Sequence, residues 1–253
     1  MGLITNAASL AGAALLALAA VAPANAEPIR NIVIVHGALV DGSGWRDVHN
    51  RLTDRGYSVT IVQPPMTTLE DDVAATRRAL ELQDGPSVLV GHSYGGLIIT
   101  EAGTTDDVAG LVYIAAFQPD AGETLAGLAA EIPPATTGIK ATPDGFLYLD
   151  PAVFAADFAA DVPRPVAEFM GRSQVLPAQV TFETKITAPA WKVKPSWALI
   201  PTSDRAINPD LMRQMASRAG STAEETEASH AVFISQPDVV AALIERAAKT
   251  LAD

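Results

Sequence analysis

The sequence predicts an α/β protein with a doubly wound, mostly parallel sheet and a mixed helix and hairpin insertion over it. Three observations support this: short runs of apolar residues recur, helical segments separate them, and one proline-rich stretch interrupts the alternation. Runs that are apolar on both faces suit central parallel strands covered by helices. Strands that alternate with helices therefore indicate one parallel sheet joined by helical crossovers.

The predicted strands are short and rich in β-branched residues. They cover 32–35, 59–62, 87–90, 111–114 and 197–200, with a last, more polar strand at 222–227. The predicted helices begin at capping residues or proline, or end near glycine. They cover 45–55, 69–83, a segment starting at 97, 209–219 and a last helix from 237. Ligands of such sheets bind at the carboxyl ends of the strands, so functional residues are expected in the loops there.

Residues 117–194 break this alternation. The stretch holds half of the chain's 18 prolines and has a hairpin signal, Pro-Asp-Gly, at 143–145. Because a structureless loop of this length is uncommon inside a domain, we expect short helices at 151–160 and 166–173. Its apolar and aromatic side chains are expected to pack mostly within the insertion, and the remainder to line a pocket.

The amino-terminal residues 1–26 contain no Asp, Glu, Lys or Arg and end in a small-residue Ala-Asn-Ala pattern at Ala26. This predicts a secretory signal peptide, an exported (periplasmic or secreted) protein and no stable membrane span in the mature chain. A retained hydrophobic anchor is the alternative. The rest of the chain is predicted to form a core from 27–116 and 195–253 with a cap insertion at 117–194.

Composition excludes several classes of function. The formal net charge is −12, from 17 Lys+Arg against 29 Asp+Glu, and no basic patch stands out, so nucleic acid is not an expected partner. Without cysteine there is no disulfide, thiolate nucleophile or Cys-ligated metal. The four histidines lack the HExxH or HxH spacing of common metal sites. A metalloenzyme is therefore disfavoured.

The strand at 87–90 runs into the sequence Gly-His-Ser-Tyr-Gly-Gly, after which a helix can begin. A GxSxG turn between a strand and a helix exposes the serine hydroxyl above the sheet, and glycine at the flanking positions 91 and 95 lets the two elements approach. Ser93 is therefore the candidate nucleophile. The structural alternative is a glycine-rich turn at a helix N-terminus.

A serine nucleophile needs a positioned base and a carboxylate that orients it. His230 is the candidate base, since it follows the last predicted strand and precedes the terminal helix. His36 is expected to be a buried structural histidine at the end of the first strand. Asp204 directly follows the strand at 197–200 and gives the chain order Ser, Asp, His. Asp120, which follows the preceding strand, is the competing acid.

The developing oxyanion needs backbone donors. One is the amide of Tyr94, the residue after the nucleophile, and another is expected in the loop after the first strand. In that loop, a tight turn at Gly37 would present the amide of Ala38. Trp45, at the end of the same loop, is expected to anchor the following helix by packing.

Together these motifs resemble the α/β-hydrolase superfamily, in order over residues 30–250: GHSYGG, HGALVDGSGW, the aspartate after WALIPTS, and SHAVFISQP. The first-strand loop and the cap hairpin are similar to those of plant methylesterases, hydroxynitrile lyases and their bacterial esterase relatives. The resemblance implies a cofactor-independent serine hydrolase that cleaves a small-molecule carboxylic ester through an acyl-serine intermediate, with a pocket between sheet and cap. It implies Ser93 as nucleophile, His230 as base, Asp204 as acid, and Ala38 and Tyr94 as oxyanion donors.

Departures from that branch narrow the chemistry. Ala231 stands where hydroxynitrile lyases carry a lysine and Ala38 where their loop carries a threonine, which disfavours cyanohydrin cleavage. Ser93 disfavours the dehalogenases and epoxide hydrolases, whose nucleophile is Asp. A lactonase or amidase would use the same triad. A receptor that binds a small molecule with little turnover, or a tethered interaction protein with an uncleaved leader, could share the fold.

Overall fold

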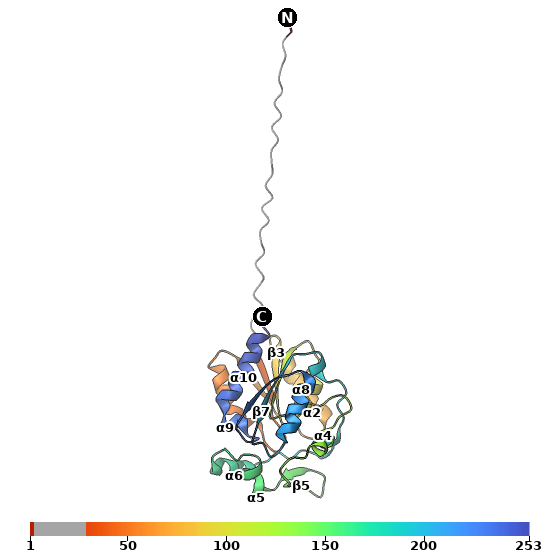
Figure 1. Cartoon of the computed structure of the whole chain (residues 1–253), viewed down its shortest axis with the longest axis vertical. Coiled ribbons are helices and arrows are strands. Elements are labelled where there is room, and N and C mark those ends of the chain that lie inside the picture. Colours follow the sequence, from red (N-terminus) through yellow and green to blue (C-terminus); the bar gives the residue numbers. More distant parts are fainter. Residues whose placement is uncertain (3–28, 253) are drawn as a thin grey trace.

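The computed structural model describes residues 1–2 and 29–252. The predicted signal peptide, apart from its first two residues, lies outside the described residues. The chain forms a six-stranded parallel sheet in the order β2-β1-β3-β4-β7-β8. Figure 1 shows α9 and α10 along one side of this sheet and α2 and α8 along the other. The predicted doubly wound α/β fold is therefore confirmed.

The six strands match the predicted apolar runs to within a few residues. They are β1 (Asn31–Val35), β2 (Ser58–Val62), β3 (Ser87–His92), β4 (Val108–Ile114), β7 (Ser196–Pro201) and β8 (Thr222–Thr226). Every residue of β1 and β3 is buried, as expected for central strands that helices cover on both faces. β8 lies at the edge of the sheet and is more exposed, which accounts for its polar sequence.

The predicted core helices form, with ends within about two residues of the predicted ones, and one short helix, α9, was not predicted. The core helices are α1 (Arg46–Thr53), after the 3-10 turn η1 (Gly42–Trp45), α2 (Leu69–Glu81), α3 (Gly95–Ala102), α8 (Pro209–Ala219), α9 (Val232–Ser235) and α10 (Pro237–Thr250). The side chains of Thr68 and Asn208 accept hydrogen bonds from the first turns of α2 and α8. Gly220 ends α8 in the left-handed conformation, with φ 66°.

Residues 117–194, all of them described, contribute no strand to the six-stranded sheet, and we call them the cap segment. Their elements are α4 (Leu125–Glu131), β5 (Ile139–Ala141), β6 (Leu147–Leu149), α5 (Pro151–Asp157), α6 (Arg164–Arg172), α7 (Val180–Glu183) and the 3-10 turn η2 (Ala190–Lys192). β5 and β6 form the predicted hairpin. The helix predicted over 151–160 is shorter than expected and ends at Asp157. In Figure 1, β5, α5 and α6 gather at one end of the molecule.

Aromatic packing joins the loop after β1 to the helix α9. Trp45 is fully buried and stacks on Phe233 of α9, with ring centroids 4.8 Å apart. This contact fixes the start of α1 against the loop that carries His230, as expected for a packing residue. Among the described residues, no helix has both the length and the apolar character needed to span a bilayer.

Candidate active site

Ser93 occupies the turn between β3 and α3 in a strained backbone conformation. Its φ is 53°, in the left-handed region that residues other than glycine rarely adopt. The Ser93 amide donates to the Ala115 carbonyl at 3.1 Å, and the Ser93 carbonyl accepts from the amides of Gly96 (3.0 Å) and Phe117 (3.2 Å). These three bonds hold the turn in place, which is the geometry expected of a GxSxG elbow.

The two glycines of the motif allow backbone contacts that a side chain would block. A Cβ added to Gly91 would lie 2.6 Å from the Gly95 carbonyl oxygen. A Cβ added to Gly95 would lie 2.5 Å from the Val35 carbonyl oxygen at the end of β1. Strand and helix therefore approach as closely as the sequence pattern predicted.

His230 and Asp204 meet, although they come from loops after different strands. His230 Nδ1 lies 2.6 Å from Asp204 Oδ2, and both side chains are buried. The second carboxylate oxygen of Asp204 accepts from the amides of Ala206 (2.8 Å) and Ile207 (2.9 Å). When Nδ1–H donates to this carboxylate, Nε2 is the ring nitrogen that can accept a proton.

Ser93 and His230 line the same cavity, which has a volume of about 220 Å³. Ala38 and Tyr94 line it as well, so both predicted oxyanion donors lie at its wall. Apart from His230, the residues of the described chain that line it are uncharged, and most are apolar, among them Phe158 from the cap segment. The structure thus places the candidate nucleophile, base and oxyanion residues around one apolar space.

Tyr94 is held by a buried carboxylate that the sequence analysis missed. Its hydroxyl donates to Asp72 Oδ2 at 2.6 Å, and Asp72 Oδ1 accepts from the Met66 amide at 2.7 Å. Burial raises the pKa of Asp72, although both hydrogen bonds oppose the rise. Burial also raises the pKa of Tyr94, as does the adjacent Asp72, so the phenol stays protonated. An aspartate in the first turn of a helix gives no sequence signal for this role, because exposed aspartates are favourable there too.

The two other buried histidines have structural surroundings. The His92 ring lies 4.7 Å from the His230 ring, and His92 Nε2 lies 3.1 Å from the His230 carbonyl oxygen. Burial, and then the nearby His230, lowers the pKa of His92 well below its ordinary value. His36 is buried between the Gln63 side chain (2.9 Å) and the Gly37 carbonyl (2.8 Å), and burial lowers its pKa too. His36 is thus the buried structural histidine that the sequence predicted.

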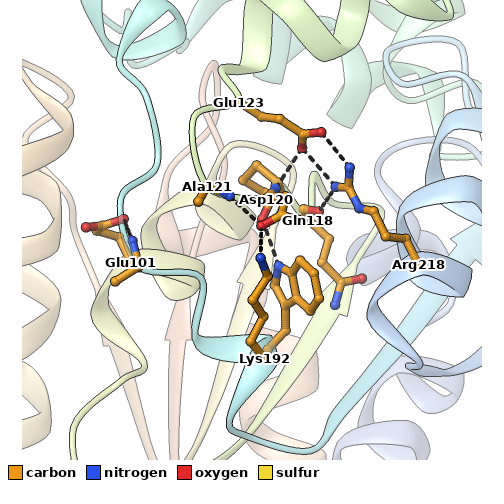
Figure 2. Close-up of polar contacts among 10 residues, drawn as sticks. Glu101, Gln118, Asp120, Ala121, Glu123, Lys192 and Arg218 are labelled. Atoms are coloured by element: carbon orange, nitrogen blue, oxygen red, sulfur yellow. Dashed lines mark hydrogen bonds and ion pairs between the residues drawn. The ribbon is translucent and has the colours of Figure 1, made fainter.

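Asp120, the competing acid, belongs to a different cluster (Figure 2). Its carboxylate pairs with Lys192 and accepts from the Ala121 amide at 2.6 Å. The hydrogen bond from Lys192 holds the pKa of Asp120 below its ordinary value, although partial burial opposes this. Glu123 of the same cluster accepts from the Asp120 amide and pairs with Arg218. The structure therefore engages Asp120 with Lys192, whereas Asp204 contacts His230.

Comparison with known proteins agrees with this architecture. A family model described as "Alpha/beta hydrolase family" matches residues 32–243. The chain therefore belongs to the α/β-hydrolase family. It is 29% identical over 245 residues to the alpha/beta hydrolase nvfD of Aspergillus novofumigatus, covering 86% of this chain and 96% of that protein. It is 38% identical over 118 residues to a carbendazim hydrolyzing esterase of a Nocardioides species, covering 39% of this chain and 46% of that protein.

Solved structures share the fold. A pyrethroid hydrolase from Sphingobium faniae has a TM-score of 0.74 at 23% identity, covering 87% of this chain and 97% of that one. Polyneuridine aldehyde esterase has a TM-score of 0.74 at 18% identity, covering 87% of this chain and 99% of that one. These solved structures show the fold, and the relatives that match in sequence are named as an alpha/beta hydrolase and an esterase.

Proposed function

We propose that this protein is a carboxylesterase that works through Ser93, His230 and Asp204. The observation that carries the proposal is the 2.6 Å contact between His230 and Asp204 at the wall of a cavity that Ser93 also lines. Asp204 orients the imidazole and stabilises its charged form, so Nε2 can take the Ser93 proton. A serine on a strained turn with such a base is an activated nucleophile.

The reaction has two halves. Ser93 attacks the ester carbonyl while His230 takes its proton, and the alcohol then leaves with that proton. Water next attacks the acyl-serine while His230 takes its proton; the bond between Ser93 Oγ and the acyl group then breaks, the carboxylic acid leaves, and His230 returns the proton to Ser93. The amides of Ala38 and Tyr94 are proposed to stabilise the oxyanion of both tetrahedral intermediates.

The cavity indicates the class of ester. Its volume of about 220 Å³ lies below the roughly 300–1,000 Å³ of sites for drug-sized ligands. An ionised substrate group would be desolvated there, and apart from His230 none of the described residues that line the cavity carries an ionisable carboxylate, ammonium or guanidinium group to pair with it. We therefore propose neutral esters with a small apolar group as substrates. No observation favours a lactone or an amide over an ester, and a panel of p-nitrophenyl esters, lactones and amides distinguishes them.

The two candidate acids provide the test. Asp204→Asn is expected to lower kcat for p-nitrophenyl esters by about four orders of magnitude, because the imidazole loses its orienting carboxylate. Asp120→Asn is the matched control and should stay within about threefold of wild type, since Asp120 pairs with Lys192. Equal losses in the two variants would rule out the assigned acid. Labelling by a fluorophosphonate that persists in Ser93→Ala would rule out the nucleophile.

We also propose export with cleavage after Ala26, and a core of 27–116 and 195–253 with a cap insertion at 117–194. The uncharged, alanine-rich leader and its small-residue cleavage pattern support the first point. The mass of the protein recovered from the periplasm or medium is expected to correspond to a chain that begins at Glu27. A full-length chain that stays with the membrane would contradict export and favour the anchor.

A further inference from the structure

The cap segment holds the loop of His230 from both sides of that residue. The amide of Ala231 donates to the Phe158 carbonyl at 3.0 Å. The amide of Ser229 donates to Asp161 at 3.1 Å, and the Ser229 hydroxyl donates to the other oxygen of the same carboxylate. The Phe158 ring meets the His230 ring edge-on, with centroids 4.6 Å apart and an angle of 84° between the planes.

The same part of the cap also holds the loop of Asp204. Arg205, the next residue, donates from Nε to Asp157 Oδ1 at 2.8 Å. The second oxygen of Asp157 accepts from the Thr136 hydroxyl at 2.7 Å. The Thr136 amide in turn donates to the Arg205 carbonyl at 2.8 Å. Arg205 is therefore fixed through both its side chain and its backbone by residues of the cap.

Residues of the core also form hydrogen bonds with these loops. The Ser203 amide donates to the Ala228 carbonyl at 3.1 Å, which links the loop after β7 to the loop after β8. His92 contacts the His230 carbonyl at 3.1 Å. The first bond joins the two loops to each other, and the second comes from the last residue of β3. The cap segment adds hydrogen bonds to the residues next to Asp204 and His230.

We propose that residues 157–161, which we call the α5 C-terminal segment, position Asp204 and His230 for catalysis. The inference rests on the proposed function. Asp157 and Asp161 are positioning residues that act through Arg205 and Ser229. The cap segment would thus be part of the catalytic machinery as well as a wall of the pocket. Small displacements of a catalytic group cost large factors in rate, so losing this support should lower kcat roughly 10- to 100-fold.

A purely structural role for this segment makes a different prediction. If it only anchored the cap over the pocket, its loss would lower the melting temperature and raise KM, while kcat per active site would stay the same. If it positions His230, kcat falls while KM changes little, because the reacting groups lose their alignment. The ratio of the two kinetic effects therefore separates positioning from anchoring.

The test uses the full chain and p-nitrophenyl acetate, with active sites counted by fluorophosphonate titration. Asp161→Ala is expected to lower kcat 10- to 100-fold with KM within about threefold of wild type. Asp161→Asn should recover most of the loss, because its amide oxygen still accepts from Ser229. Asp150→Ala is the matched control: it removes the side-chain cap of the same helix, α5, and an exposed ion pair with Lys140, and should keep kcat.

Ser229→Ala is the second variant and removes the hydroxyl, which donates to Asp161 and accepts from the Ala231 amide at 3.4 Å, so a loss of about threefold or more in kcat is expected. If Asp161→Ala does not fold, this variant decides, and an unchanged kcat overturns the inference. An active wild type with equal kcat values for Asp161→Ala and Asp150→Ala overturns the inference alone. A wild type without Ser93-dependent ester hydrolysis overturns the proposed function, and this inference with it.

Discussion

Replacing Tyr94 with phenylalanine would remove one hydroxyl from the buried network next to the turn that carries Ser93. That hydroxyl donates to Asp72 at 2.6 Å, and the Asp72 carboxylate is fully buried. After the change, the carboxylate keeps the Met66 amide as a donor. The backbone amide of residue 94, which is the proposed oxyanion donor, stays in place. We therefore expect a large effect on stability and kcat within about threefold of wild type.

The size of the effect follows from the charge of the partner. A hydrogen bond to a charged group contributes about 1.5–3 kcal/mol to the free energy of unfolding, and one between neutral groups about 0.5–1.5 kcal/mol. Tyr94→Phe should cost the larger amount, which corresponds to a fall of roughly 3–12 °C in the melting temperature for a chain of this length. Tyr113→Phe is the matched control, since the Tyr113 hydroxyl is also buried but bonds the neutral Thr100 hydroxyl at 2.8 Å.

The loss of stability caused by Tyr94→Phe should also depend on pH. Burial raises the pKa of Asp72 in the folded protein, and the Tyr94 hydroxyl opposes that rise. Removing the hydroxyl raises the pKa further. An acid whose pKa is higher in the folded than in the unfolded state takes up its proton first in the folded state, so its charge destabilises the protein as pH rises. The stability difference between Tyr94→Phe and wild type should therefore be larger at about pH 8 than at about pH 5.

Urea unfolding followed by tryptophan fluorescence at both pH values measures these differences. A cost for Tyr94→Phe no larger than that for Tyr113→Phe would refute the reasoning, because it would show that Asp72 gains nothing from being charged and bonded. A penalty independent of pH would refute it as well. In either case the carboxylate would have to be protonated, or solvated, in the folded wild type.

Three further predictions, two for substitutions and one for pH, test other parts of the structure. Gly95→Ala places a Cβ 2.5 Å from the Val35 carbonyl oxygen and should lower the free energy of unfolding by about 3 kcal/mol or more in urea titrations. Burial lowers the pKa values of His36 and His92, so these rings take up protons mainly on unfolding. The free energy of unfolding should therefore reach its full value above about pH 6.5. At about pH 5.5 it should be lower by up to about 1.4 kcal/mol per histidine. Ala129→Phe should narrow the cavity and raise KM about tenfold for bulky esters but not for acetates.

Each of these three predictions has a control or an outcome that would contradict it. Gly85→Ala adds a Cβ whose nearest contact is the Asn31 side chain at 3.8 Å, so the free energy of unfolding should change by less than about 0.5 kcal/mol. An unfolding free energy that stays flat from about pH 8 to about pH 5.5 would contradict the burial of neutral imidazoles. Uniform KM changes across esters of different size would contradict the assignment of this cavity as the substrate pocket.

Local patterns predicted most of the secondary structure. Apolar runs marked the central strands, and Asn208, Pro209 and Gly220 marked both ends of α8. The sequence analysis missed the short helices α4, α7 and α9, of seven, four and four residues. Two turns or fewer contain too few repeats for helical periodicity to show, and isolated helices of that length are unstable without tertiary contacts. Their formation therefore depends on tertiary packing, such as the stacking of Phe233 in α9 on Trp45.

Part of the candidate site could likewise be predicted from local sequence, and part of it depends on tertiary contacts. Ser93 and its strained turn follow from the GxSxG pattern, because the conformation is set within a few residues. The choice between Asp204 and Asp120 stayed open, because both follow strands that end at the same edge of the sheet. It depends on where distant groups lie: Lys192 pairs with Asp120, and His230 contacts Asp204. Asp72 gave no signal at all.

The amino-acid sequence alone determined the alternation of strands and helices, the nucleophile turn and the chemical types available for catalysis. These depend on periodicity, capping and turn geometry, which act over a few neighbouring residues. Only the tertiary structure decided which carboxylate meets His230, which one supports Tyr94, and that the end of α5 contacts the loops of both Asp204 and His230. Such pairings join residues far apart in the chain, and they are selected by burial and hydrogen-bond geometry once the elements have packed.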